Sequence, residues 1–211
     1  MSSHAKMTAR SESLSPIRIA FVGDSFVNGT GDPECLGWVG RVCRSAAARG
    51  HGVTLYNLGI RRDTSVDVAA RWKEEVGRRL VPKERSGIVF SFGVNDCVME
   101  NGRPRVDPAA TLQNARRVLT DASNIAPCLM IGPPPIDDDG VNRRLDALTP
   151  RLADMCRDLA VPFLDTLSPL RRSAVWRAEV ARGDGAHPAD GGYDDLARLI
   201  DEWRAWRPWL P

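Results

Sequence analysis

The chain has 211 residues, of which 43% are hydrophobic and 27% are charged, and its formal net charge is +2. This length suffices for one domain with a core of its own, and the composition is ordinary for a soluble globular protein. The small net charge gives no electrostatic reason to expect nucleic acid or an anionic membrane as a partner.

Five cysteines are scattered along the chain without a CxxC pair: Cys35, Cys43, Cys97, Cys128 and Cys156. Their odd number and their spacing predict neither a zinc site nor a disulfide framework. We expect reduced, mostly buried thiols in a cytoplasmic protein. Residues 1–16 are polar and lack the apolar core of a signal peptide, so we expect a disordered N-terminal tail. No apolar run approaches the roughly 18 residues that span a bilayer.

The first predicted element is a buried parallel strand over residues 17–22, which ends at Gly23. Ser25 therefore lies just past the carboxyl end of this strand, at the edge where open α/β sheets bind ligands. On this stretch alone, Ser25 is either an exposed nucleophile or the cap of the next helix.

Further strands and helices alternate along the rest of the chain. Strands are predicted over 53–58, 87–92, 128–131 and 161–164. Helices are predicted over 36–49, 64–80, 107–124, 142–159 with a kink or restart at Pro150, 168–181 and 190–206. This pattern predicts an α/β fold, a flavodoxin-like three-layer α/β/α sandwich whose five parallel strands follow the order 2-1-3-4-5. We expect residues 17–211 to form one domain.

A glycine-rich loop over residues 28–33 follows Ser25. It fits neither of the glycine-rich phosphate-binding patterns, GxGxxG and GxxxxGK[ST], so a nucleotide interpretation is weak and no cofactor is expected.

The carboxyl ends of the first three predicted strands supply Ser25, Gly59 and Asn95, and these ends converge in this topology. Ser25 could attack an ester, while the amides of Ser25 and Gly59 and the side chain of Asn95 could donate to the oxyanion. Taken singly, Gly59 is more often a turn glycine and Asn95 a turn residue.

The general base follows by elimination among three histidines. His4 lies in the tail and His51 at the amino end of a strand, whereas His187 follows the fifth strand on the correct side of the sheet. Asp184, three residues earlier, is close enough to hold the imidazole. Alternatively, both are ordinary loop residues, or the Asp-x-x-His pair is half of a metal site, although no third ligand is apparent.

Four short blocks together resemble the SGNH/GDSL hydrolase family, in the family's order: Gly23-Asp24-Ser25-Phe26, Asn57-Leu58-Gly59, Gly93-Val94-Asn95-Asp96 and Asp184-Gly185-Ala186-His187-Pro188. The resemblance implies a flavodoxin-like fold and serine esterase chemistry without a metal or cofactor. It assigns the nucleophile to Ser25, oxyanion donors to Gly59 and Asn95, the base to His187 and its partner to Asp184. Phe26 departs from the family, which has leucine there. The GxSxG elbow of α/β-hydrolases is absent.

We therefore expect a serine esterase acting on a small-molecule ester. We expect short acyl chains to be favoured, because the loops predicted to form the pocket walls, 26–35, 97–107 and 133–141, contain few long apolar runs. An acyltransferase or thioesterase using the same site is the alternative among enzymes. A non-catalytic ligand-binding domain is the alternative from another class.

Three other features lead to further expectations. We expect Trp203, Trp206 and Trp209 to pack the last helix onto the body, with a homo-oligomer interface as the alternative. Cys97 follows the Asn95 turn but lacks a spare histidine to activate it. The acidic triplet 137–139 is expected to be a solvated loop.

Overall fold

A five-stranded parallel sheet forms the centre of the computed structural model, which describes residues 15–210. Its strands, in the spatial order β2-β1-β3-β6-β7, are β2 (Val53–Gly59), β1 (Ile17–Gly23), β3 (Ser86–Ser91), β6 (Cys128–Ile131) and β7 (Phe163–Leu164). This order confirms the predicted order 2-1-3-4-5 of the five main strands. The predicted tail lies outside the described residues, apart from Ser15 and Pro16.

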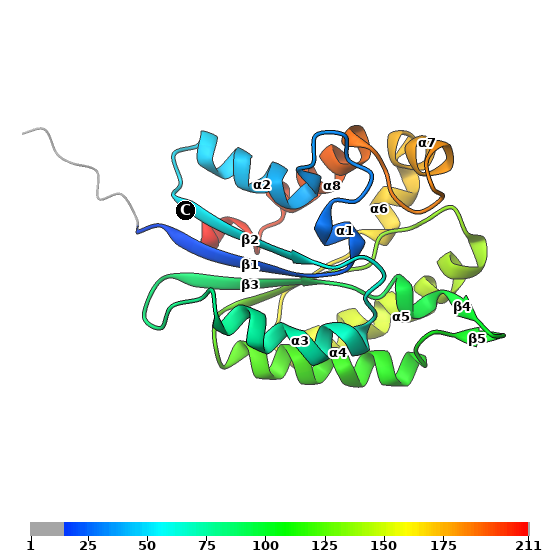
Figure 1. Cartoon of the computed structure of the whole chain (residues 1–211), viewed down its shortest axis with the longest axis horizontal. Coiled ribbons are helices and arrows are strands. Elements are labelled where there is room, and N and C mark those ends of the chain that lie inside the picture. The colour runs from blue at the N-terminus through cyan, green and yellow to red at the C-terminus, as the bar shows by residue number, and fades with distance from the viewer. Residues whose placement is uncertain (1–14, 211) are drawn as a thin grey trace, which may run out of the picture.

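Two helical layers cover the sheet (Figure 1). One layer contains α1 (Ser25–Asn28), α2 (Gly37–Ala48), α6 (Leu167–Arg172), α7 (Ala174–Arg182) and α8 (Asp190–Glu202). The other contains α3 (Ser65–Gly77), α4 (Pro108–Ser123) and α5 (Asp139–Asp158). The predicted three-layer architecture is therefore present. Within the described range, no helix combines the length and apolar character needed to cross a membrane.

Local sequence signals set several helix starts. Thr64 and Asp67 form a capping box at the start of α3, since each side chain accepts the backbone N–H of the other. Asp107 caps α4, and Pro108 follows it at the first helical position. Proline suits this position because the N–H that it lacks would have no partner within the helix in any case.

The predicted elements differ from the observed ones at several places. The predicted helix 168–181 is two helices, because Ser173 is extended and its hydroxyl accepts the Trp176 N–H to cap α7. Helix α5 runs through Pro150 without the expected restart. Helix α8 ends at Glu202, four residues earlier than predicted, because Trp203 turns to an extended conformation.

The segment between β3 and α4, predicted as a loop, contains two small elements. A short 3-10 helix, η1 (Asn95–Cys97), is followed by a two-stranded antiparallel hairpin of β4 (Met99–Glu100) and β5 (Arg103–Pro104). These strands are too short to show a period-2 pattern in the sequence. The hairpin stands at the carboxyl edge of the sheet (Figure 1), which is also where Ser25 lies.

The C-terminal tryptophans pack against the body, as expected. Trp206 is buried, and a final 3-10 helix, η2 (Arg207–Trp209), places the Trp209 ring over Gly87. A Cβ on Gly87 would lie 2.4 Å from that ring, so β3 has no room for a side chain there.

Candidate active site

The turn from β1 into α1 places Ser25 at the carboxyl edge of the sheet. Gly23 ends the strand against β3, where a Cβ would lie 1.8 Å from the carbonyl oxygen of Ser91. Asp24 then caps α1 by accepting the Phe26 N–H at 3.0 Å. Ser25 is thus the first residue of a one-turn helix, and its side chain stays at the sheet edge.

His187 approaches Ser25 from the loop between α7 and α8, which is 162 residues away in sequence. Its Nε2 atom lies 2.7 Å from the Ser25 Oγ, and its Nδ1 atom lies 2.7 Å from the Asp184 Oδ2. The Phe26 ring packs beside the imidazole, with centroids 5.0 Å apart. The structure therefore brings the three predicted side chains into one hydrogen-bonded chain.

The Asp184 carboxylate is held in its ionised form. Burial would raise its pKa, but the amides of His187 and Ala186 and the His187 imidazole all donate to it, and together they lower the pKa to about 2. An ionised carboxylate only accepts hydrogen bonds. The Nδ1 atom of His187 must therefore carry a proton. In the neutral imidazole, this leaves Nε2 as an acceptor facing the Ser25 hydroxyl.

The predicted oxyanion donors Gly59 and Asn95 lie at the same edge of the sheet, but only one of them has an N–H without an acceptor among the described residues. One N–H of the Asn95 side chain donates to the Asp63 carbonyl at 2.9 Å, and its second N–H has no acceptor in the described structure. The Gly59 amide is already engaged, because it donates to the Asn57 Oδ1 at 3.0 Å.

Close packing is the structural reason for glycine at position 59. A Cβ there would lie 2.1 Å from the Asn28 amide and 2.7 Å from the Asp24 carbonyl. Any side chain would therefore push α1 away from β2, and Ser25 with it.

Two residues at this edge were not identified from the sequence. The Asn57 side chain bridges β2 and α1, since its Nδ2 donates to the Val27 carbonyl at 2.8 Å while its Oδ1 accepts from Gly59. Arg62 has a left-handed backbone with φ of 70°, which is unfavourable for a side-chain-bearing residue. Asn57 stands in the second block beside Gly59, but nothing in the sequence signals the conformation of Arg62.

Arg62 belongs to the segment that joins β2 to α3 and is bonded to Asn95 through Asp63. The Ile60 amide at its start donates to the Gly23 carbonyl at 3.0 Å, and Asp63 at its end accepts from Asn95. Between these two anchors, the Arg62 amide has no acceptor among residues 15–210. A strained residue with a free amide beside the predicted site is a candidate anion donor.

The glycine-rich loop after α1 is held together by hydrogen bonds to one of its own side chains, Asp32, and it does not present a row of free amides. The Asp32 carboxylate accepts the amides of Glu34, Leu36 and Gly37 and pairs with the buried Arg41. Burial raises the pKa of Asp32, but these donors outweigh it and the net shift is downward. The loop therefore has a packing role on the His187 side of the site, where Gly31 contacts the Pro188 carbonyl.

The surroundings of Cys97 and of the acidic triplet 137–139 give these residues structural roles. Burial and the neighbouring Asp96 raise the pKa of the Cys97 thiol to about 12, so it is not an activated nucleophile. Asp138 caps α5 by accepting the Val141 N–H at 2.8 Å. The amide of Asp137 donates to the Gly185 carbonyl, which joins the acidic turn to the His187 loop.

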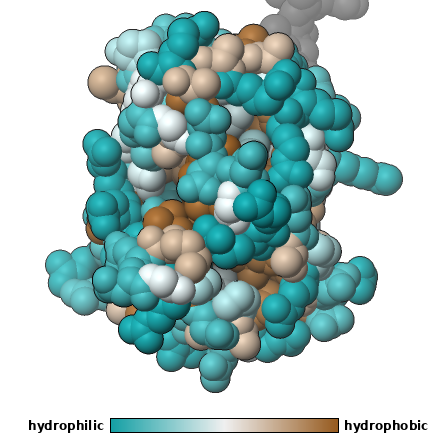
Figure 2. All heavy atoms as spheres, turned by 90° about the vertical axis from the view of Figure 1, so that its right-hand side faces the viewer, coloured by the Kyte–Doolittle hydropathy of each residue, from teal (hydrophilic) through white to brown (hydrophobic). Residues whose placement is uncertain are grey.

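A cavity of about 300 Å³ adjoins Asp184 and His187, and its other walls include Thr30, Gly31 and Arg61. Figure 2 shows this face of the molecule, where apolar side chains lie in hollows between polar ones. Residues 15–210 contain no cluster of three histidine, cysteine or carboxylate residues that could hold a metal ion.

Comparison with known proteins gives a consistent result. The sequence model of the GDSL-like Lipase/Acylhydrolase family matches residues 21–194. A lipase/acylhydrolase from Enterococcus faecalis has a similar structure, with a TM-score of 0.72 and 25% identity over 87% of this chain and 92% of that chain. An acetylxylan esterase from Geobacillus stearothermophilus has a TM-score of 0.69 and 20% identity over 86% of this chain and 91% of that one. Catalytic mutants of that esterase replace a serine, a histidine and an aspartate by alanine. A search of curated protein sequences finds no match.

The family match spans most of the chain and includes Ser25 and His187, which the fold brings into contact. The chain therefore belongs to the GDSL-like lipase/acylhydrolase family and is a hydrolase that acts on ester bonds.

Proposed function

We propose that the chain is a serine esterase in which Ser25, His187 and Asp184 act as a catalytic triad through an acyl-enzyme intermediate. The 2.7 Å contact between the Ser25 Oγ and the His187 Nε2 carries this proposal, because it gives the hydroxyl a base that can take its proton. Asp184 holds the imidazole in the tautomer that the step needs.

The reaction proceeds in two halves. The Ser25 Oγ attacks the acyl carbon while its proton passes to Nε2 of His187, and the carbonyl oxygen becomes an oxyanion. Collapse of this intermediate expels the alcohol, which takes the proton from Nε2. A water molecule then attacks the acyl-enzyme, gives a proton to Nε2, and releases the acid as Ser25 recovers that proton.

The oxyanion is stabilised by donors that are already in place at the sheet edge. We assign this role to the amide of Ser25 and the side chain of Asn95, together with a third backbone amide from the segment after β2. Gly59 can supply the third donor only if its amide releases Asn57, whereas Arg62 needs no such exchange. We therefore favour Arg62 over Gly59, and the two are distinguished by experiment below.

Short acyl chains suit the surroundings of His187. The adjoining cavity has a volume of only about 300 Å³ and no large apolar side chain in its lining, so it has little room in which to bury a long acyl chain. The relatives include an acetylxylan esterase, whose catalytic mutants affect the same three residue types, with the histidine three positions after the aspartate. This spacing supports the assignment of Asp184 and His187.

The proposal is tested with p-nitrophenyl esters from acetate to palmitate and with a fluorophosphonate probe. The wild-type protein should hydrolyse the short esters fastest and be labelled at Ser25. The Ser25→Ala variant should lose several powers of ten in turnover while its circular dichroism spectrum stays unchanged. Near-full activity in that variant, or labelling at another residue, would refute the assignment.

A further inference from the structure

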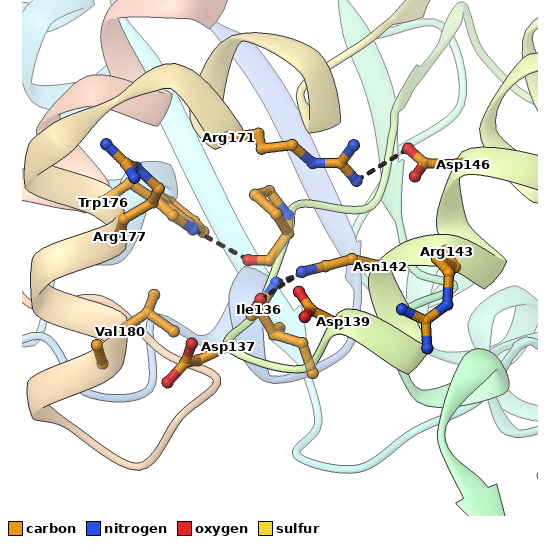
Figure 3. Close-up of a pocket in the computed structure, with 12 residues that line it drawn as sticks. Ile136, Asp137, Asp139, Asn142, Arg143, Asp146, Arg171, Trp176, Arg177 and Val180 are labelled. Atoms are coloured by element: carbon orange, nitrogen blue, oxygen red, sulfur yellow. Dashed lines mark hydrogen bonds and ion pairs between the residues drawn. The ribbon is translucent and has the colours of Figure 1, made fainter.

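The cavity of about 300 Å³ beside His187 is next to the proposed triad, because His187 and Asp184 form part of its wall. A larger cavity, of about 500 Å³, lies between α5 and α7 (Figure 3). Its wall residue Trp176 stacks on Phe26 with centroids 6.2 Å apart, and Phe26 in turn packs on His187. These two buried rings separate the larger cavity from His187, so the smaller cavity is the better placed to receive part of the ester.

A short turn between β2 and α3 carries Arg61 into the wall of this smaller cavity. The Asp63 amide closes the turn by donating to the Ile60 carbonyl at 3.3 Å, and the Ile60 amide is anchored on the Gly23 carbonyl. Arg62 has its left-handed conformation within the same turn. The backbone around Arg61 is therefore fixed on both sides, although the side chain itself is exposed.

The two arginines of this turn differ in their partners. Arg62 pairs with Glu100 of the hairpin at 3.3 Å, and its carbonyl accepts from the Arg105 guanidinium at 3.0 Å. Arg61 instead lines the cavity together with His187. Among residues 15–210, the Arg61 guanidinium has no hydrogen-bond or ion-pair partner. It is thus a cation with unused donors beside the proposed general base.

The two carboxylates in the same wall already have donors. Glu179 Oε2 accepts two backbone amides at the start of α8, at 3.0 and 2.6 Å. Asp184 accepts two amides of its own loop as well as the His187 imidazole. These bonds hold both carboxylates on the α7 and α8 side of the cavity, so the charged group that remains for a ligand is Arg61.

The position of His187 indicates which part of the ester reaches Arg61. In the proposed reaction, Nε2 of His187 gives its proton to the leaving alcohol, so the alcohol part lies on the His187 side of Ser25. The cavity extends from His187 to Arg61. A charged group on the alcohol part would therefore meet the guanidinium.

We propose that Arg61 selects esters whose alcohol part carries a carboxylate, that is, acylated hydroxy acids; this inference rests on the proposed function. A guanidinium can donate two parallel N–H bonds to a carboxylate, which combines charge with geometry. One guanidinium matches one negative charge, and the ionised Asp184 nearby disfavours a doubly charged phosphate. Arg61 thus gives specificity to a cavity that has no large apolar side chain in its lining.

The test compares acetate esters of phenols that differ in their para substituent. The ester p-acetoxybenzoate carries the carboxylate, its methyl ester is neutral, p-acetoxyphenyl phosphate is a dianion and p-acetoxyphenyltrimethylammonium is a cation. Each kcat/KM is divided by the rate constant of the same ester with hydroxide, which removes differences in leaving-group reactivity. The carboxylate ester should have the highest ratio, about 10- to 100-fold above the neutral ester, the usual effect of a charged hydrogen bond.

Variants of Arg61 assign this preference to one side chain. Arg61→Gln should reduce the preference to a few fold or less, whereas Arg61→Lys should retain part of it because the charge remains. Arg117→Gln is the matched control, since this exposed arginine lies on α4, in the helical layer on the other face of the sheet. In the Ser25→Ala protein, NMR titration should give a lower Kd for p-acetoxybenzoate than for its methyl ester, and Arg61→Gln should remove that difference.

Several outcomes would overturn the role of Arg61: equal ratios for the carboxylate and neutral esters, a preference that survives in Arg61→Gln, or an equal loss in Arg117→Gln. A highest ratio for the phosphate or the cationic ester would overturn the carboxylate as the selected group. A preference for p-nitrophenyl hemisuccinate over p-nitrophenyl butyrate, without one for p-acetoxybenzoate, would overturn the assignment to the alcohol part. Failure to hydrolyse p-nitrophenyl acetate would instead overturn the proposed function.

Discussion

The backbone amide of Gly59 donates to the side-chain oxygen of Asn57, 3.0 Å away and two residues earlier on the same strand. The same Asn57 side chain holds the Val27 carbonyl of α1. One asparagine thus links the helix that carries Ser25 to the strand that carries a predicted oxyanion donor. The bond also occupies that donor, while the Arg62 amide nearby is free.

Replacing single backbone amides by esters distinguishes the two candidates. An α-hydroxy acid at position 62 removes the N–H of Arg62 and should lower kcat by roughly 10² to 10³, as is usual for an oxyanion donor. The same change at position 59 should leave kcat within a few fold. The opposite pattern would return the role to Gly59, and both forms should be checked for unchanged Tm.

The side-chain donor is tested by Asn95→Ala. Because Asn95 is expected to bind charge that develops only in the transition state, kcat should fall by roughly 10² to 10³ with a smaller effect on KM. The lost bond to the Asp63 carbonyl should lower Tm slightly. An unchanged kcat with a raised KM would make Asn95 a residue that positions the substrate.

The sequence predicts the framework of this site because local signals and topology agree. A parallel sheet brings the carboxyl ends of its strands together, so Ser25 and Asn95 share an edge and His51 does not. Helix caps such as Thr64 depend on residues only a few positions apart, so the sequence alone predicts them. The close approach of Asp184 and His187 followed from their spacing of three residues.

The features that could not be predicted depend on contacts between distant residues. The Asn57 side chain that engages the Gly59 amide is held by the Val27 carbonyl of α1, and the left-handed backbone of Arg62 contradicts its residue type. The break at Ser173 was missed because the segment keeps helical residues on both sides. The cavity of about 500 Å³ between α5 and α7 forms only because these helices face each other, which no local pattern indicates.

A buried ion pair should make the loop after α1 sensitive to mutation. Arg41 is 4% exposed and its guanidinium pairs with Asp32, Glu34 and Asp194. Arg41→Met leaves the buried Asp32 without its cation and should cost about 3 to 5 kcal/mol of unfolding free energy in urea titrations. Arg78→Met, which breaks an exposed pair with Glu74, is the control and should cost less than about 0.5 kcal/mol. Equal losses would show that the Arg41 pair is not a structural anchor.

Thiol reactivity should separate one cysteine from the other four. Burial raises the pKa of Cys43, Cys97, Cys128 and Cys156 to about 12, whereas Cys35 is exposed. In the native protein, Ellman's reagent should therefore modify one thiol quickly, and Cys35→Ser should abolish that phase. Modification of Cys35 should leave esterase activity in place. A second fast thiol would contradict the burial of the other four.

The stability of the protein should depend on pH through Asp24, the residue before Ser25. Its side chain is 1% exposed, its Oδ1 accepts the Phe26 N–H, and its Oδ2 is buried without a partner in the described structure. Burial raises the pKa to about 7; the Phe26 amide opposes this shift, and the carboxylates of Asp96 and Asp63 add to it.

In the unfolded chain, an aspartate titrates near about 3.9. Between that value and about 7, folded Asp24 keeps a proton that the unfolded chain has released. Stability should therefore fall as the pH rises through this interval and remain lower above it. Asp24→Asn preserves the cap through its own Oδ1 and does not titrate. Its Tm should be close to that of the wild type at pH 4 and exceed it at pH 8.

The measurement is Tm at pH 4, 5, 6, 7 and 8 for the wild type, for Asp24→Asn and for the surface control Asp154→Asn. The Tm gap between Asp24→Asn and the wild type should widen with pH. Expressed as unfolding free energy, the widening should be on the order of a few kcal/mol, since each pKa unit is worth about 1.4 kcal/mol. The control should show no such widening. A gap of constant size would mean that Asp24 is ionised throughout, and that an unpaired charge is tolerated at the residue before Ser25.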